Sequence, residues 1–587
     1  MNIVGISMGY HDSACCILRN GVLIAAAQEE RFSRVKNDKS MPRRAFRFCL
    51  QRAGISIEDV DCVAYYEDPC LKLGRQLWSM MNATEGTRER AAILTRLTHD
   101  TPEEVLRLML GFEGRIEVVD HHLSHAGSAY YFSGFDDAAV LTLDGVGDWP
   151  TTTYSAANGD RIERFESVDY PHSLGLFYST LTGYLGFEVN EGEYKIMGLA
   201  PYGQPRYFDE LAQLVVAGPG GQYQLDMRYF DFAQADKMYT QRLVELLGRG
   251  ARGPAEPVEQ FHKDVARSTQ LVLEEVLLRK VIYLHERVPS EQLCLAGGVA
   301  LNVVANSRVL REGPFKRLFV QPAAGDAGGA LGAAAVASMR LGEGRPNPLE
   351  HVYLGPDNPV DATYRMLKST SARFEDFRGQ EGQLLRAVVA QLSAGKIVGW
   401  CQGRCEFGPR ALGARSILAD PRRPEMRDRI NASVKMREQF RPFAPSVLDT
   451  QRSMHFDLDH ASPFMLETCQ VRSPLDLPAI THVDNSARVH TVTAAANPRF
   501  AALLEEFFRR TGCPMLLNTS FNLKGEPIVL TAEDAIACFA RSTIDVLVID
   551  DFLLERHSMP AYWGILAYAR PRSSGGEAVT HSVYTFL

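Results

Sequence analysis

Two histidines spaced four residues apart are the first side chains in this sequence that could do chemistry. His121 and His125 lie in the stretch VDHHLSHAGSAYYF. In a helix this spacing places both imidazoles on one face, where they could bind one divalent metal. The stretch lacks the Glu with which H-E-x-x-H metalloproteases activate water, so a protease is not expected. Spacing alone leaves open the alternative of two hydrogen-bonded structural histidines.

Two aspartates beside glycines are the candidates to complete a metal site. Asp144 lies in LTLDGVGDW and Asp326 in AAGDAGGALG, each at the end of a predicted strand. Two imidazoles with two carboxylates suit iron(II), manganese or zinc better than magnesium, which prefers oxygen ligands and water. The sequence therefore predicts a transition-metal site and leaves the metal open.

Glycines in two strand-to-helix units could let an anion approach the backbone. The units are LCLAGGVALNVVANSRVL, around Gly297, and RLFVQPAAGDAGGALGAAAVASM, around Asp326. Free backbone N–H groups at a helix start and the helix dipole favour an anion, the dipole by about 0.3 to 1 kcal/mol. Alternatively, the glycines only permit tight packing of strand against helix, and the sequence leaves both explanations open.

A basic stretch late in the chain predicts a site for a small anion. Basic residues outnumber acidic ones between Arg404 and Arg441, although the whole chain has a formal net charge of -8. Guanidinium groups match phosphate oxygens, and each charge-assisted hydrogen bond contributes roughly 1.5 to 3 kcal/mol. The rigid or small residues around the arginines in GPRALG and FRPFAPS favour a built site over a solvated charged face. The negative net charge argues against a nucleic acid as the partner.

The strands that must position these residues occur in two similar sets. An apolar run over residues 2–8 is followed by a loop, a second run over 14–18, the hairpin dipeptide Asn20-Gly21 and the strand VLIAAAQ. The same order recurs from Ala138, as AVLTLDG, TTTYSAA, Asn158-Gly159 and RIERFESV. Such a repeat predicts a duplicated α/β domain of the actin and sugar-kinase type, with both first turns facing a shared cleft.

A Pro- and Gly-rich stretch over residues 341–359 is the clearest domain boundary. We expect a first domain over residues 1–345, with helical, charged insertions near 70–114 and 207–254. The second domain, over residues 360–587, should be mixed α/β. Its expected strands are KIVGWCQG, CPMLLN and DVLVI, and its expected helix starts after Thr531 with Asp534 in capping position.

The bulk composition is that of an ordinary globular protein. The 587 residues, too many for one core, are 45% hydrophobic and 23% charged. No signal peptide begins the chain, and no apolar run approaches the ~20 residues of a membrane span, so we predict a cytoplasmic protein without a membrane partner. The 11 cysteines show no disulfide framework and are expected to be reduced.

Nine motifs in order resemble one enzyme family. They are GYHDSACC, EERFSRVKND, HHLSHAGSAYYFSGF, EGEYKIMGLAPYG, AGGVALN, AAGDAGGALG, GPRALGARSIL, FRPFAPSVL and LNTSFN. Together they resemble the NodU/CmcH/TobZ family of O-carbamoyltransferases over nearly the whole chain. The resemblance implies a first domain similar to the tRNA threonylcarbamoyl transferase TsaD and a second domain similar to YrdC.

The resemblance also implies an activity and its ligands. The YrdC-like domain is expected to form carbamoyl adenylate from carbamoyl phosphate and ATP, with Mg²⁺ accompanying the ATP. The TsaD-like domain is expected to pass the carbamoyl group to a hydroxyl of a small molecule, such as an antibiotic or a sugar. The residues that would hold carbamoyl phosphate and ATP are Arg410, Arg415, Lys435, Arg441, Arg488, Asn518 and Ser520. Those that would contact the adenylate are Lys195, Gly198, Gly297, Gly298, Asn302, Gly328 and Gly329.

By the same resemblance, an iron-type metal is bound by His121, His125, Asp144 and Asp326. His11, in the first loop, is the expected proton acceptor for the attacking hydroxyl, with Asp12 orienting it or the substrate. On residue type alone, a histidine in such a loop is more often a turn residue. Lys39 is a further candidate for the substrate cleft, and a homodimer is one option for assembly.

Two other functions compete with this interpretation. One is a threonylcarbamoyl-type transferase that modifies tRNA, which would leave the phosphate-binding arginines idle. The other is a non-catalytic nucleotide-binding interaction protein related to chaperone ATPases.

Overall fold

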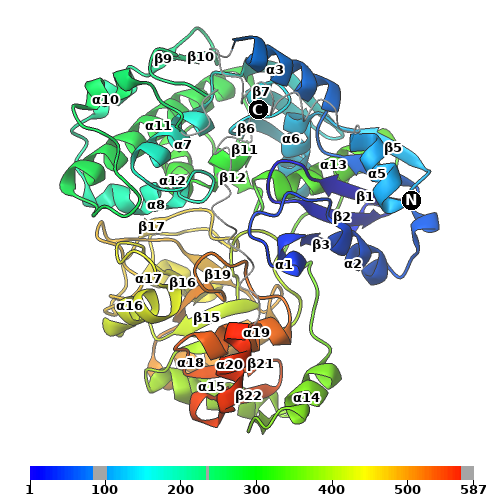
Figure 1. The fold of residues 1–587 in the computed structure, drawn as a ribbon, viewed down its shortest axis with the longest axis vertical. Helices are drawn as coiled ribbons and strands as arrows, with labels where there is room; N and C mark the ends of the chain where they lie inside the picture. Colours follow the sequence, from blue (N-terminus) through cyan, green and yellow to red (C-terminus); the bar gives the residue numbers. More distant parts are fainter. Residues whose placement is uncertain (83–101, 233–236, 570–587) are drawn as a thin grey trace. The chain divides into compact units, whose positions relative to one another are not determined.

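The computed structural model describes residues 1–82, 102–232 and 237–569, and the chain divides into two units (Figure 1). Unit 1 comprises residues 1–29 and 39–349, and unit 2 comprises residues 30–38 and the described residues from Glu350 onward. The short segment 30–38 is thus part of unit 2, although the sequence placed it in the first domain. Parts of both predicted insertions and the end of the predicted second domain lie outside the described residues.

Unit 1 contains two five-stranded sheets of the same topology. The first has the order β3-β2-β1-β4-β5, and the second has the matching order β8-β7-β6-β11-β12. In each sheet the first three strands along the chain are antiparallel and the last two extend the sheet in parallel. The predicted duplication of an α/β domain is therefore confirmed. The strands are β1 (Asn2–Ser7), β2 (Ala14–Arg19), β3 (Val22–Gln28), β4 (Cys62–Tyr65), β5 (Arg115–Val118), β6 (Asp137–Leu143), β7 (Pro150–Asn158), β8 (Arg161–Asp169), β11 (Gln292–Ala296) and β12 (Arg317–Val320).

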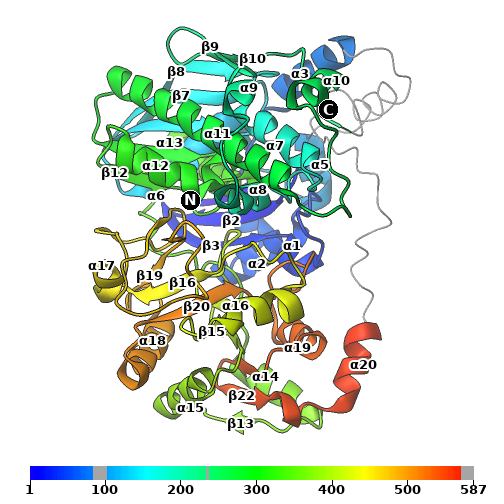
Figure 2. The ribbon, with the colours of Figure 1, turned by 90° about the vertical axis from the view of Figure 1, so that its left-hand side faces the viewer.

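Helices cover these sheets, and the long helix α11 packs against α7, α8 and α12 (Figure 2). A small hairpin, β9 (Val215–Ala217) and β10 (Tyr223–Leu225), lies in the second predicted insertion. The helices are α2 (Arg43–Ala53), α3 (Pro69–Asn82), α5 (Pro102–Leu110), α6 (His121–Ser133), α7 (Leu174–Tyr184), α8 (Glu193–Leu199), α9 (Phe208–Ala212), α10 (Gln241–Leu247), α11 (Gln260–Arg287), α12 (Val303–Glu312) and α13 (Asp326–Arg340).

Helix α13 packs closely against both α6 and β1, and glycines make this approach possible. A Cβ atom on Gly332 would lie 1.7 Å from the carbonyl oxygen of Ser124, on α6. A Cβ atom on Gly5, in β1, would lie 1.9 Å from the carbonyl oxygen of Ala330. Any side chain at either position would push the elements apart. Gly332 therefore sets the distance between the helices that carry His125 and Asp326, and Gly5 sets the distance of α13 from β1.

Unit 2 is built on one mixed sheet of eight strands, in the order β13-β22-β21-β14-β15-β20-β16-β19. The sheet strands are β13 (Glu375–Asp376), β14 (Val398–Cys401), β15 (Arg415–Ala419), β16 (Ala444–Leu448), β19 (His490–Val492), β20 (Met515–Ser520), β21 (Val546–Ile549) and β22 (Phe552–Glu555), and a separate pair is β17 (Cys469–Gln470) with β18 (Ser486–Ala487). The helices are α1 (Glu30–Ser33), α14 (Val360–Ser369), α15 (Glu381–Ser393), α16 (Glu425–Ile430), α17 (Arg452–His455), α18 (Pro498–Thr511), α19 (Ala532–Arg541) and α20 (Ala561–Ala569).

The strands and the helix that the sequence predicted in unit 2 are present in the structure. The three expected strands form as β14, β20 and β21, and the expected helix forms as α19. Its N-cap Thr531 accepts a hydrogen bond from the amide of Asp534, whose carboxylate accepts one from the amide of Thr531 at 3.2 Å. This reciprocal capping box satisfies amide groups that a helix start leaves without partners.

Among the described residues, no helix combines the length and apolar character needed to cross a membrane. All 11 cysteines are free thiols, as predicted, and ten of them are buried.

Candidate functional site

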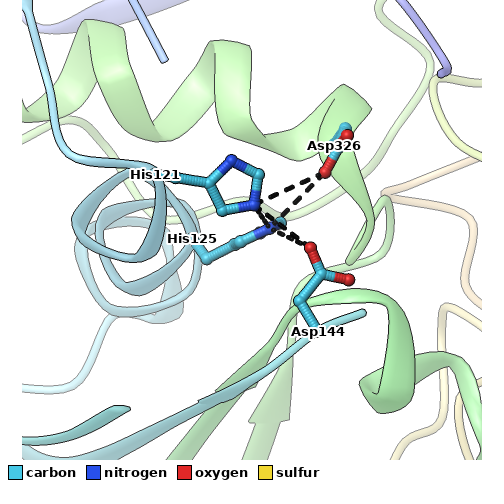
Figure 3. Close-up of side chains that lie close together, drawn as sticks. All are labelled: His121, His125, Asp144 and Asp326. Atoms are coloured by element: carbon cyan, nitrogen blue, oxygen red, sulfur yellow. Dashed lines mark hydrogen bonds and ion pairs between the residues drawn. The ribbon is translucent and has the colours of Figure 1, made fainter. Parts of the chain in front are cut away.

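Four side chains of unit 1 converge on one buried point, as predicted (Figure 3). The Nε2 atoms of His121 and His125 lie 3.1 Å apart. Asp144 Oδ2 lies 3.1 Å from the first of these nitrogens and 3.3 Å from the second. Asp326 Oδ1 lies 3.7 Å from both. All four side chains are less than 10% exposed.

Each of the four residues is placed by the end of an element. His121 and His125 occupy the first two turns of α6, whose N-cap Asp120 accepts a hydrogen bond from the amide of Leu123 at 2.8 Å. Asp144 directly follows β6, as expected. Asp326 is not at a strand end, which corrects the sequence prediction: it is the first residue of α13. An acidic residue is favourable there because it faces the positive end of the helix dipole.

The donor set fits a transition metal. Ligand atoms about 2.1 Å from a tetrahedral metal lie roughly 3.4 Å from one another, and the distances above match that spacing. The Oδ1 atom of Asp326 is buried and accepts no hydrogen bond within the described part of the chain. A cation between the four side chains would satisfy this atom and offset the charge of both carboxylates.

The charges in this cluster shift the pKa values in opposite directions. Burial lowers the pKa of His121, but the carboxylates of Asp144 and Asp326 outweigh burial and raise it to about 9. The same balance raises the pKa of His125. Burial raises the pKa of Asp144, but the two imidazoles bring it well below its ordinary value. The two carboxylates therefore favour positive charge at this point, whether it comes from protons on the imidazoles or from a metal.

The predicted base, His11, lies beside this cluster. Its Nδ1 atom is 3.0 Å from Asp12 Oδ2 and 4.0 Å from Asp326 Oδ2, and its side chain is 24% exposed. Burial lowers the pKa of His11, but Asp326 and Asp12 outweigh this effect and raise it to about 10. An imidazole with this pKa carries a proton at neutral pH, so it can accept one only after the negative charge beside it is offset. Lys39 lies near the same loop, where its carbonyl oxygen accepts a hydrogen bond from the amide of Gly9 at 3.0 Å.

Unit 2 gathers positive charge instead. Burial lowers the pKa of Arg488 well below its ordinary value, and the guanidinium groups of Arg410, Arg437 and Arg441 lower this pKa further. Lys435 is buried too, and its Nζ atom lies 3.1 Å from Ser520 Oγ. These residues form a cationic cluster, whose mutual repulsion an anion such as phosphate would relieve.

Two other predicted phosphate ligands are held by the chain itself. Arg415 is fully buried and donates to carbonyl oxygens that include those of Gln402 at 2.9 Å and Leu530 at 3.1 Å. The amide nitrogen of Asn518 donates to Ser446 Oγ at 2.9 Å, while its buried Oδ1 atom accepts no hydrogen bond among the described residues. These contacts support a structural role for Arg415, and its phosphate-binding role stays a prediction.

Comparison with known sequences identifies the family of this chain. Residues 2–335 match the family described as Carbamoyltransferase N-terminus, and residues 389–556 match Carbamoyltransferase C-terminus. The chain belongs to the carbamoyltransferase family. It is therefore an enzyme that transfers carbamoyl groups.

Relatives of this carbamoyltransferase cover between 44% and 96% of the chain. Nodulation protein NolNO of Sinorhizobium fredii is 38% identical over 96% of this chain and 81% of its own length. The uncharacterized protein sll1178 of Synechocystis is 43% identical over 95% of this chain and 97% of its own. The 3'-hydroxymethylcephem-O-carbamoyltransferase of Streptomyces clavuligerus is 37% identical over 44% of this chain and 48% of its own.

Five of the predicted adenylate-binding residues of the carbamoyltransferase lie at three places in unit 1, and the other two lie on α13. Gly297, with a φ of +92°, and Gly298 follow β11, and the amide of Gly298 donates to Asp144 Oδ1 at 2.9 Å. Asn302 caps α12 and exchanges hydrogen bonds with Gln270 at 3.0 Å. Lys195 and Gly198 lie on α8, with Lys195 Nζ 5.5 Å from the centre of the Phe187 ring. Their contacts with a nucleotide stay predictions.

Gly328 and Gly329 are packing positions in this structure. A Cβ atom on Gly328 would lie 2.4 Å from the carbonyl oxygen of Ala323, and one on Gly329 would lie 2.6 Å from Cδ2 of Tyr66. These contacts favour the packing explanation that the sequence left open for the glycines of α13.

Sequence reasoning missed three residues around the sites. The hydroxyl of Tyr66 lies 3.4 Å from Asp326 Oδ2. Asp148 accepts hydrogen bonds from the amides of His121, at 2.9 Å, and Asp68, at 3.0 Å, and burial raises its pKa to about 7. Arg437 belongs to the cationic cluster. Only Arg437 had a sequence signal, since it lies within the basic stretch.

Proposed function

We propose that this carbamoyltransferase forms carbamoyl adenylate from carbamoyl phosphate and ATP, and transfers the carbamoyl group to a hydroxyl of a small molecule. The observation that carries the adenylate step is the cationic cluster of unit 2. A protein with a net charge of -8 has no general need for several arginines and a buried lysine in one place. Two phosphorylated substrates would bring negative charge to this group of cations.

In this proposal, unit 2 carries out the phosphate chemistry. Arg410, Lys435, Arg441 and Arg488 would hold the phosphates in a fixed arrangement and lower the energy of the charge that develops on them. Mass balance requires that each carbamoyl adenylate formed leaves one pyrophosphate from ATP and one inorganic phosphate from carbamoyl phosphate, with one water consumed. Pyrophosphate is therefore the direct signature of this step.

Unit 1 would carry out the transfer in which the acceptor oxygen forms a bond to the carbamoyl carbon and AMP leaves. In this proposal His11 takes the hydroxyl proton, and Asp12 orients the imidazole. His121, His125, Asp144 and Asp326 would hold a transition metal, whose chemistry is that of a Lewis acid for a phosphate oxygen of the leaving group. Iron(II), manganese and zinc all suit these ligands.

The acceptor is expected to be a natural-product alcohol or a sugar. One relative is named for a hydroxymethylcephem, and others are named nodulation proteins. A role in antibiotic biosynthesis is therefore one candidate. Alcohols with a hydroxymethyl group are the first acceptors to screen.

The test combines the protein with ATP, Mg²⁺, carbamoyl phosphate labelled in its carbonyl carbon and a panel of alcohols, without RNA. We expect pyrophosphate to be released only when carbamoyl phosphate is present, and label to appear in an alcohol. Transfer of label only to tRNA would instead support the RNA-modifying alternative. No pyrophosphate under any condition would overturn the proposed adenylate step.

A further inference from the structure

The segment 30–38 fastens two loops of unit 2. The guanidinium of Arg31 donates to the carbonyl oxygen of Gly408 at 2.7 Å. The guanidinium of Arg34 donates to the carbonyl oxygens of Ile528 at 2.6 Å and Pro527 at 2.8 Å. Because a carbonyl oxygen belongs to the main chain, such bonds fix the course of a loop rather than the rotamer of a side chain.

Arg31 is built into this position. It is only 3% exposed, and it forms an ion pair with Glu30, which is also buried. The second carboxylate oxygen of Glu30 accepts a hydrogen bond from the amide of Asn37 at 3.0 Å. A buried ion pair is seldom the most stable way to fill a space, but it orients both partners strictly. The guanidinium of Arg31 is therefore held in one direction, toward Gly408.

Gly408 lies two residues before Arg410, in a loop that is fastened on its other side as well. Its φ of +112° is accessible to glycine and strained for other residues. Farther along the loop, Asn518 donates to the carbonyl oxygen of Ala411 at 3.1 Å. The carboxylate of Glu406 accepts a hydrogen bond from the amide of Leu412 at 2.8 Å. Arg410 thus projects from a short piece of chain with a held residue on each side.

We infer that Arg31 is a positioning residue for Arg410, and that the segment 30–38 serves to order the phosphate-binding loop of unit 2. The inference rests on the proposed function, since it takes Arg410 to be a phosphate ligand. A misplacement of about 1 Å in a reacting group can cost roughly 100-fold in rate. Loss of the hydrogen bond to Gly408 should therefore weaken the binding of phosphate, although Arg31 itself does not contact the phosphate.

The experiment uses the full-length protein with Arg31→Ala. The matched control is Arg34→Ala, which also removes an arginine side chain from the segment 30–38, but one that contacts a different loop of unit 2. Carbamoyl-phosphate-dependent exchange of pyrophosphate into ATP gives KM for each substrate, and thermal unfolding reports on stability. We expect Arg31→Ala to raise KM for carbamoyl phosphate by about 10- to 100-fold. Arg34→Ala should change it by less than about threefold. Arg31→Ala should have the lower unfolding midpoint because Glu30 loses its buried partner, so KM is compared at a temperature at which both variants are folded.

A double-variant cycle separates positioning from a general structural role. If Arg31 acts through Arg410, adding Arg31→Ala to Arg410→Ala should cause little further loss. Equal losses from Arg31→Ala and Arg34→Ala, or full additivity with Arg410→Ala, would overturn the inference. If Arg31→Ala does not fold, Arg31→Lys takes its place, and a KM equal to that of the unaltered protein would overturn the inference in the same way.

A binding measurement distinguishes failure of this inference from failure of the proposed function. If the unaltered protein shows no pyrophosphate exchange, the adenylate step is wrong. Calorimetric titration with inorganic phosphate then still compares the unaltered protein with Arg31→Ala and Arg410→Ala. Weaker binding in both variants supports the positioning role, and equal binding in all three proteins, or none in any, rules it out.

Discussion

The two units concentrate opposite charges. In unit 1, two carboxylates and two imidazoles bring their ligand atoms to one buried point, where they could hold a cation. In unit 2, burial lowers the pKa of Arg488, and the guanidinium groups of Arg410, Arg437 and Arg441 lower it further, as expected at a site for an anion. Each cluster is costly without its ligand, because like charges repel and burial removes water. Both are therefore better explained by binding than by stability.

The division of labour between these clusters gives the largest expected effect. Arg410→Ala should lower pyrophosphate release by more than about 100-fold while leaving transfer from supplied carbamoyl adenylate intact, because in the proposed function this arginine holds only the phosphates of the first step. His11→Ala should do the reverse, because proton transfer contributes about 100- to 10,000-fold. Separate assays measure pyrophosphate release and transfer from supplied carbamoyl adenylate. An equal loss of both activities in either variant would contradict the division of labour between the two units.

Removal of one ligand residue should be enough to disrupt metal binding at the cluster in unit 1. His125→Ala should weaken binding of iron(II), manganese or zinc by more than about 100-fold, since even the loss of a residue that only hydrogen-bonds a metal ligand costs about 10- to 100-fold. His122→Gln is the matched control, because the Nδ1 atom of His122 bonds Thr142 Oγ1 at 2.7 Å rather than joining the cluster. Metal content after dialysis, measured by plasma emission spectroscopy, should be normal in the control. An equal loss in both variants would mean that packing, not ligation, was removed.

Buried histidines in the two units should respond oppositely to pH. Carboxylates raise the pKa of His121, whereas burial without any acid lowers that of His490, in β19, to about 3. Between about pH 6.5 and 3 the unfolded chain therefore binds a proton at this position that the folded chain does not. The free energy of unfolding should fall as the pH drops below 6.5, by at most about 1.4 kcal/mol per unit from this group.

The contribution of His490 can be isolated by His490→Gln, which removes the titrating group. Urea unfolding of both proteins at pH 7.5, 6.5 and 5.5 should show a smaller loss of stability with falling pH in the variant. Parallel pH profiles would exclude His490 as the source.

The smallest expected effect comes from removing one arginine of the cationic cluster, which should change phosphate binding and stability in opposite directions. Arg488→Met removes one cation from the cationic cluster and keeps most of the apolar volume. It should stabilise unit 2 by about 1 kcal/mol, because repulsion is relieved, while weakening phosphate binding. Urea unfolding tests the expected stability, and phosphate titration tests the expected loss of binding. A destabilised variant would show that acidic or polar groups of the protein already offset the charge of the cationic cluster.

Local sequence patterns predicted the elements of this carbamoyltransferase well. Asn20 and Gly21 form their turn with positive φ angles of +49° and +74°, and the capping box at Thr531 forms as expected. The spacing of His121 and His125 was sufficient to place them on one helix face. All of these signals depend on neighbours in the chain, whose geometry is the same in any fold.

The tertiary structure decided the rest. Nothing local to residues 30–38 indicates that the segment belongs to the second half of the protein, because its partners Gly408 and Ile528 lie hundreds of residues away. Asp144 and Asp326 are ligand candidates by composition, but only the close packing of α13 on α6, which Gly332 permits, brings Asp326 to His125. The sequence alone determined which side chains could bind a metal or a phosphate. Whether they meet depends on distances between elements, which backbone contacts remote in sequence set to within about an ångström.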